Sequence, residues 1–185
     1  MSAFVYVRIK QAIGHNMNSL SKADGDIAYT AWLARNLLEL KVWVAYCATS
    51  RQRAEEFFDD ALRDMIEMNS KFSTESATTN AAKGAVDPFK PPHKFKRVSD
   101  AASDVGMKDL FDYHNKQLSK FAHPTALSVM TRQVALVSVA KEVAMQAESL
   151  AAEALTELES SHMADLFRTC PPKMQEEMEN LTDLT

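Results

Sequence analysis

A polar stripe in the segment YHNKQLSKFAHP (113–124) carries the side chains best suited to chemistry. At 100° per residue, four of them fall near one face of a helix that ends before the next proline: Lys116, Ser119, Lys120 and His123. A histidine beside cationic groups can act as an acid or base on a phosphodiester, while the cations stabilise the phosphate charge. Alternatively, His123 only caps its helix through backbone carbonyls, and the residue types alone leave both interpretations open.

A second charged motif lies on the most apolar stretch of the chain, residues 26–50. Arg35 and Glu39 stand at i, i+4, which places them one above the other on one helix face. A charge on a mostly buried helix costs free energy unless it is paired or used. Arg35 is therefore a candidate phosphate-binding group. The alternative is a buried ion pair, joined by Tyr113 or His123, that sets the register of the helices.

A basic and aromatic segment lies between the two motifs, in residues 83–97. It holds five basic residues and one acidic residue, with phenylalanines among them. Segments of this kind contact phosphates and stack bases in proteins that bind single strands. The alternative is a solvated loop that its phenylalanines pin to the protein. The candidate substrate-binding residues are Lys90, Lys94, Phe95, Lys96 and Arg97, together with Tyr113.

The two motifs together resemble the HEPN-like group of bacterial helical proteins. The signature of that group is Arg-x-x-x-Glu on one helix, here Arg35 and Glu39 in ARNLLEL, followed downstream by Leu-Ser-x-x-x-His-Pro, here residues 118–124. The resemblance implies a bundle of four or five helices that is commonly a homodimer. Many such proteins are metal-independent ribonucleases of toxin–antitoxin and other defence systems, and others bind RNA or nucleotides without cutting them.

The resemblance also implies roles for individual side chains. Catalytic members carry an arginine near positions 116–118, where this chain has Lys-Gln-Leu, and lysine lacks the bidentate fork of arginine. We therefore expect Arg35 to supply the guanidinium from a neighbouring helix. No metal or cofactor is expected, because the attacking group is the RNA 2′-hydroxyl. The expected catalytic set is His123 as acid or base, Arg35 and Lys116 as phosphate stabilisers, and Ser119 and Glu39 as orienting groups.

These motifs require a helical scaffold, and the composition favours one. Gly is scarce, at 4 residues, while good helix formers dominate. We expect an all-α fold, a helical bundle of four to six helices with one long irregular connection, in a single domain that spans residues 1–185. The helices are expected near residues 3–20, 26–50, 51–71, 107–122 and 125–160, the irregular connection at 73–106, and an acidic C-terminal tail at 161–185 with two short helical pieces around its proline pair.

Charge and hydropathy bound the location of the protein. The formal net charge of −4 argues against an overall electrostatic grip on nucleic acid, although a local basic patch remains compatible with it. There is no continuous run of about 18 apolar residues and no basic-then-apolar leader. We therefore expect a cytoplasmic protein that does not associate with membranes.

The spacing of the cysteine and histidine residues limits which metal sites the chain could form. Cys47 and Cys170 are far apart and are expected to be reduced thiols. Glu159 and His162 have the spacing of a di-iron ligand pair, but such sites need two copies and two further glutamates, so we expect an exposed polar pair. The expected partners are RNA, a second copy of the chain, and an antitoxin or other protein. The alternative function is a non-enzymatic bundle that acts as a protein-interaction module.

Overall fold

The fold is all-helical in the residues that the computed structural model describes, which are 1–71, 96–123 and 133–180. Five helices are long and three are short, so the expected range of four to six matches the long ones. The all-α prediction is confirmed. The helices are α1 (Ser2–Leu20), α2 (Ile27–Ala48), α3 (Arg51–Lys71), α5 (Val98–Asp104), α6 (Lys108–Ala122), α8 (Gln133–Glu159), α9 (His162–Thr169) and α10 (Pro172–Asn180).

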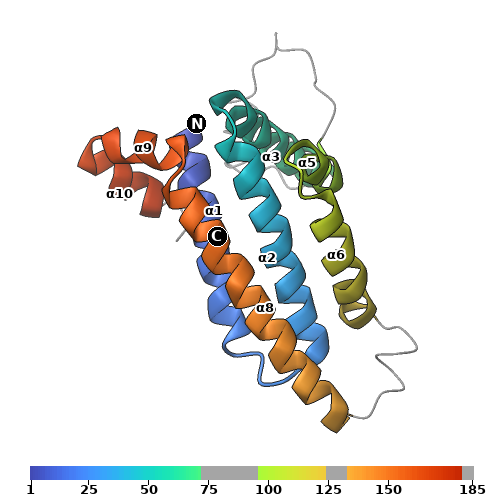
Figure 1. The fold of residues 1–185 in the computed structure, drawn as a ribbon. Helices are drawn as coiled ribbons and strands as arrows, with labels where there is room; N and C mark the ends of the chain where they lie inside the picture. The colour runs from blue at the N-terminus through green and yellow to red at the C-terminus, as the bar shows by residue number, and fades with distance from the viewer. Residues whose placement is uncertain (72–95, 124–132, 181–185) are drawn as a thin grey trace.

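Helix α2 is the centre of the bundle (Figure 1). It begins where the Asp26 carboxylate accepts hydrogen bonds from the backbone N–H groups of Ala28 and Tyr29, at 2.9 and 3.1 Å. Its most extensive contacts are with α8 and α6, and it also packs on α1, α3 and α5. Leu37 and Leu38 are completely buried. An apolar sequence on most sides of the cylinder thus becomes the core, as its pattern predicts.

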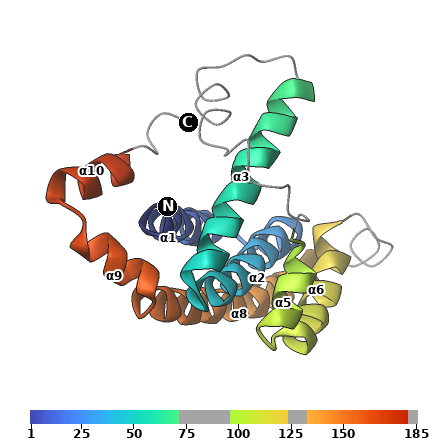
Figure 2. The same ribbon diagram turned by 90° about the horizontal axis from the view of Figure 1, so that it is seen from above.

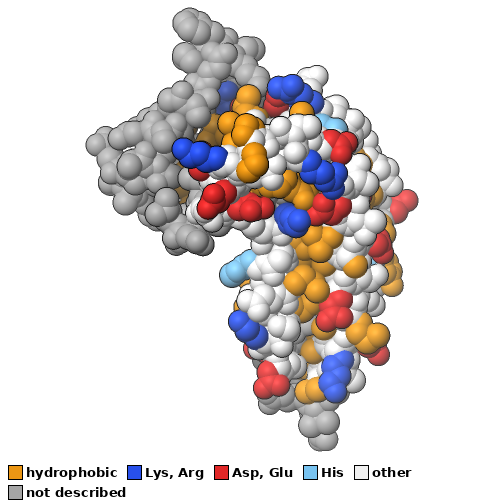
Figure 3. Space-filling view, turned by 90° about the vertical axis from the view of Figure 1, so that its left-hand side faces the viewer, with side chains coloured by type: hydrophobic (Ala, Val, Ile, Leu, Met, Phe, Trp, Pro, Cys, Tyr) orange, Lys and Arg blue, Asp and Glu red, His pale blue; other side chains and the backbone are white. Residues whose placement is uncertain are grey.

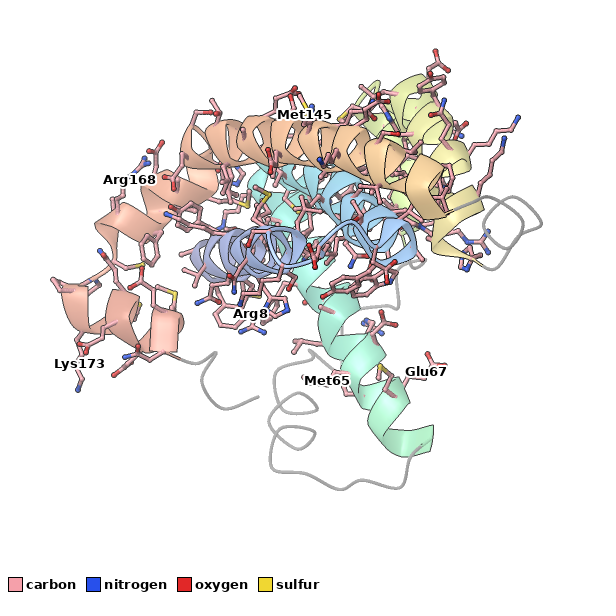
Figure 4. The ribbon with its side chains drawn as sticks, turned by 90° about the horizontal axis from the view of Figure 1, so that it is seen from below. Arg8, Met65, Glu67, Met145, Arg168 and Lys173 are labelled. Atoms are coloured by element: carbon pink, nitrogen blue, oxygen red, sulfur yellow. The ribbon has the colours of Figure 1, made fainter. Side chains whose placement is uncertain are left out.

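Helix α8 approaches α2 closely because its inner face is lined by small residues. Ala147, Ala151 and Ala154 recur at four- and three-residue spacing and are fully buried. Small side chains at a helix contact allow a short distance between the two axes. Its outer face is solvated: Met145, which is 69% exposed, points away from the bundle (Figure 4).

Helix α3 crosses the end of the bundle, and its C-terminal half projects away from it (Figure 2). Its first turns are anchored, since Ala54 is fully buried and Leu62 is 9% exposed. Met68 is 60% exposed, and Met65 and Glu67 lie on the projecting half (Figure 4). The apolar stripe expected along this helix is therefore buried in its first half only.

The expected irregular connection, 73–106, contains a helix. Residues 72–95 lie outside the described part of the chain, but Val98–Asp104 form α5, which buries Ala101 and Ala102 completely. The chain leaves α5 through Gly106, whose φ of 71° lies in the left-handed region that favours glycine. The boundary of the connection is therefore corrected at its C-terminal end, because two alanines give the segment a buried face.

The C-terminal tail folds as two short helices, as its proline pair predicts. Helix α9 begins with the Ser161 side chain accepting a hydrogen bond from the Ala164 N–H. It packs on α1, where the rings of Tyr6 and Phe167 lie 5.1 Å apart. Helix α10 buries none of its residues.

Both cysteines are free, and burial raises the pKa of the Cys47 thiol.

Candidate functional site

Arg35 and Glu39 form the expected pair on α2. Arg35 Nε donates to Glu39 Oε1 at 3.1 Å. The two side chains are 32% and 31% exposed, so the pair lies at the surface of the helix and not inside the bundle. The structural alternative expects a buried ion pair. That expectation is wrong, because the pair is partly exposed. Water therefore reaches both groups.

His123 lies directly beside this pair. It is the residue at which α6 ends, with an extended backbone (φ −113°, ψ 150°), and it is exposed. Arg35 Nη1 lies 3.4 Å from His123 Nε2, across 88 residues of sequence. A neutral imidazole with its proton on Nδ1 accepts from the guanidinium in this arrangement. The two motifs of the sequence thus meet at one place.

The antiparallel packing of α6 on α2 brings them together (Figure 1). Phe111 and Leu118 bury one face of α6. The start of the α5–α6 segment lies at the far end of α2, where Lys96 Nζ is 5.5 Å from the ring of Tyr46. The end of α6 therefore reaches the first half of α2, where Arg35 lies.

Within the part of the chain that the structure describes, the guanidinium has donors left for a ligand. Arginine carries five N–H groups, and the contacts to Glu39 and His123 account for two of them. Glu39 restricts the side chain, so the remaining donors are held in a limited set of directions. A partly exposed guanidinium beside an imidazole is a suitable arrangement for a phosphate group.

The other expected catalytic residues lie farther along α6. Ser119 is half-buried and Lys116 is exposed, and within the described residues no hydrogen bond or ion pair joins either of them to Arg35 or His123. At 1.5 Å per residue, Ser119 lies about 6 Å and Lys116 about 10 Å before His123 along the axis. Tyr113 lies about 15 Å away. It is 62% exposed and packs edge-on against the ring of His114.

The described part of the basic segment lies at the other end of α2. Lys96 pairs with Asp104 at 2.7 Å, and its backbone N–H donates to Asp60 at 3.2 Å. Tyr46, beneath Lys96, is 11 residues after Arg35, which is about 16 Å along the helix. Arg97 is exposed at the start of α5. The remaining candidates, Lys90, Lys94 and Phe95, lie outside the described residues.

An aromatic pair beside the site was not predicted. Tyr29 and Trp32 stack with their centroids 6.0 Å apart and their planes at 12°, and they are 41% and 50% exposed. They lie one to two turns before Arg35 on α2. A tyrosine and a tryptophan three residues apart mark one side of a helix, but the sequence does not show which side of the central helix remains uncovered.

The Glu159–His162 spacing does not form a ligand pair. Glu159 accepts from Tyr6 Oη at 2.8 Å, Lys10 Nζ at 2.7 Å and Arg168 Nη2 at 3.1 Å. The hydrogen bond from Lys10 is the main cause that holds the pKa of this carboxyl below its ordinary value. Across the three described ranges, no group of three or more His, Cys, Asp or Glu side chains is placed to hold a metal ion.

Surface charge is mixed on the face that Figure 3 shows, where acidic and basic side chains alternate and no broad basic area is visible.

Among the described helices, none combines the length and the hydropathy required to cross a bilayer.

Comparisons of the chain with protein-family models, with curated proteins and with solved structures found no match.

Proposed function

We propose that this protein is an HEPN-like RNA-binding protein, and that Arg35 and His123 make it a metal-independent ribonuclease. The observation that supports this is the 3.4 Å approach of Arg35 Nη1 to His123 Nε2 on a solvent-reached surface. Residues 88 apart in sequence, which carry a cation and an acid–base group, converge there with a carboxylate behind the cation.

The chemistry is an attack by the RNA 2′-hydroxyl on the adjacent phosphorus. His123 takes the 2′-hydroxyl proton as the 2′-oxygen–phosphorus bond forms. Arg35 stabilises the charge that develops on the phosphate oxygens. The bond to the 5′-oxygen breaks, and that oxygen receives a proton from the imidazolium or from water. The products are a 2′,3′-cyclic phosphate and a 5′-hydroxyl end.

Two partners belong to this proposal. Following the resemblance, we propose that the chain acts as a homodimer and within a defence or toxin–antitoxin system, where an antitoxin would restrain its activity. Sedimentation of the purified chain tests the first of these.

A structural role is the second candidate, because the contact of Arg35 with His123 also links two helices. The bond to Glu39 braces the side chain on α2, and the contact with His123 ties α2 to the end of α6. Under this alternative the bundle binds a protein partner and cuts nothing.

RNA cleavage in EDTA separates the two candidates. The wild type is compared with His123→Ala and Arg35→Ala, after circular dichroism shows that both remain folded. The matched control is His15→Ala, which removes an exposed histidine from α1. Cleavage lost in His123→Ala and kept in His15→Ala supports the nuclease. Absence of cleavage by the wild type, with Arg35→Ala unfolded, supports the structural role.

A further inference from the structure

Tyr29 and Trp32 form an exposed aromatic surface on the otherwise most buried helix of the protein. Half of Trp32 and 41% of Tyr29 remain in contact with water, whereas Ala31, Leu33 and Ala34 between and beside them are almost completely buried. The two rings are nearly parallel, at 12°. Two exposed aromatic rings side by side offer a flat apolar face that another flat ring can cover.

Trp32, the ring of this aromatic surface nearer to the Arg35–His123 pair in sequence, lies on the same side of α2 as Arg35. At 100° per residue, Trp32 and Glu39 are almost in line along the helix, and Arg35 lies about 60° to one side of that line. The rise from Trp32 to Arg35 is about 4.5 Å. A group that covers the Trp32 ring therefore has its neighbouring atoms within reach of the guanidinium.

The area of the two rings is too small for a protein interface. An aromatic side chain buries about 150–250 Å², so the exposed parts of both rings amount to roughly 200 Å². A stable protein interface buries about 800 Å² on each partner. Charged groups, Arg35 and Glu39, continue the surface on one side. Two parallel rings beside a guanidinium fit a flat, apolar ring joined to a phosphate.

We propose that Trp32 and Tyr29 are a stacking platform for a base of single-stranded RNA, whose adjoining phosphate meets Arg35. This inference rests on the proposed function and names its substrate class. The substrate is single-stranded because a base in a duplex is already stacked on both faces and cannot lie on the tryptophan. The platform reads the face of a base and not its edge, so it accepts all four bases.

Tryptophan fluorescence tests the platform directly. The chain has two tryptophans, so Trp43→Phe leaves Trp32 as the sole reporter. This variant is titrated with a short single-stranded oligoribonucleotide and with an abasic ribose-phosphate strand of the same length, at one salt concentration. The base-bearing strand is expected to quench Trp32 and the abasic strand to leave its emission unchanged. Equal quenching by both strands overturns the platform.

Binding of a labelled oligonucleotide gives the second readout. Trp32→Ala is expected to weaken binding about tenfold, which is the usual cost of removing one stacking residue. Trp32→Phe is expected to restore most of it, and thermal melting checks that each variant is folded. Trp32→Ala that binds as tightly as the wild type, or a wild type that binds no RNA, overturns the platform.

The platform and the nuclease fail in different ways. Weaker binding by Trp32→Ala, with cleavage unaffected in His123→Ala, retains the platform and rejects the nuclease. Cleavage lost in His123→Ala, with normal binding by Trp32→Ala, does the reverse. Sedimentation tests whether a second copy of the chain occupies this surface instead of RNA. If Trp32→Ala dissociates a dimer and leaves RNA binding unchanged, the surface is a dimer interface and the platform is overturned.

Discussion

Arg35 Nη1 lies 3.4 Å from His123 Nε2, and Glu39 holds the opposite side of the same guanidinium through Nε at 3.1 Å. The three groups form a chain from carboxylate to guanidinium to imidazole. Glu39 accepts a hydrogen bond from Arg35, which in turn contacts the imidazole, so we expect any effect of Glu39 on His123 to pass through Arg35. We therefore expect Glu39 to act as a positioning residue.

Glu39→Gln is expected to separate positioning from stability. The substitution keeps the size of the side chain and removes the charge that holds Arg35. The free energy of unfolding should fall by less than about 0.5 kcal/mol, because a partly exposed i, i+4 pair contributes little. RNA cleavage and RNA affinity should fall severalfold, since the guanidinium is no longer held beside His123. Urea unfolding and the cleavage assay measure the two effects.

The matched control is Glu55→Gln on α3. Glu55 also pairs with an arginine four residues earlier, Arg51, at 2.8 Å. The two substitutions should change stability by similar amounts, and only Glu39→Gln should reduce cleavage. An equal loss of cleavage in both variants would show that Glu39 has no positioning role.

Lys41 and Glu153 form the ion pair that joins α2 to α8. The Lys41 side chain is 11% exposed, whereas Glu153 is 57% exposed. Glu153→Ala leaves a nearly buried ammonium without its carboxylate and should lower the free energy of unfolding by about 1 kcal/mol, less than for a fully buried pair because water reaches this site. Lys41→Met removes the charge itself and should be close to neutral. Urea unfolding of both variants measures the two effects. A larger loss of unfolding free energy in Lys41→Met than in Glu153→Ala contradicts this account.

Most of the helix positions follow from local sequence. Asp26 starts α2 because its carboxylate reaches the first free N–H groups, and the proline pair at 171–172 separates α9 from α10. These signals act within a few residues, so they can be read without knowing the fold. Helix α5 was less visible, because its buried face consists of only Ala101 and Ala102.

The site could be predicted only in part. The Arg35–Glu39 contact follows from helix geometry, since both residues lie on one helix. The approach of His123 depends on how α6 packs on α2, and the sequence indicated it only through the motif resemblance and as one of two partners, Tyr113 or His123, of the expected ion pair. The exposure of Trp32 was not predictable, because its neighbours on α2 are apolar in every direction. Which side stays uncovered is decided by the positions of α1, α6 and α8.

Acid should weaken the attachment of α9 through Glu159. The pKa of this carboxyl is lowered in the folded state, first by the hydrogen bond from Lys10. In the unfolded chain the ordinary glutamate pKa is about 4.3, so the stabilisation is fully present above that pH and is lost as the pH falls through the lower, folded pKa. Thermal melting between neutral and acid pH should therefore show a steeper decline in the wild type than in Glu159→Gln.

Lys10→Met provides the companion test, since it removes the first cause of the shift and keeps the carboxylate. Its acid decline should be shallower than that of the wild type. If the wild type, Glu159→Gln and Lys10→Met lose stability in parallel as the pH falls, the acid sensitivity of the protein originates elsewhere.

Replacing Gly14 or Gly106 by alanine should change the stability of the protein in opposite directions. A Cβ added at Gly14 or at Gly106 meets no other heavy atom within 4 Å, so neither alanine variant is crowded. Gly14 lies inside α1, where alanine restricts the unfolded chain and should stabilise the protein by about 0.5–1 kcal/mol. Gly106 has a φ of 71°, a conformation in which an L side chain costs about 1–2 kcal/mol, so Gly106→Ala should destabilise it.

Gly106→Asn separates backbone conformation from other effects at the same turn. Asparagine adopts left-handed geometry more readily than alanine, so this variant should unfold at a higher urea concentration than Gly106→Ala. The turn connects α5 to α6, and α6 carries His123 at its far end. If the turn also sets the position of α6, the order of RNA cleavage rates should follow the order of stability, with Gly106→Asn above Gly106→Ala. Equal stability of the two variants would show that residue 106 gives up its left-handed conformation without cost.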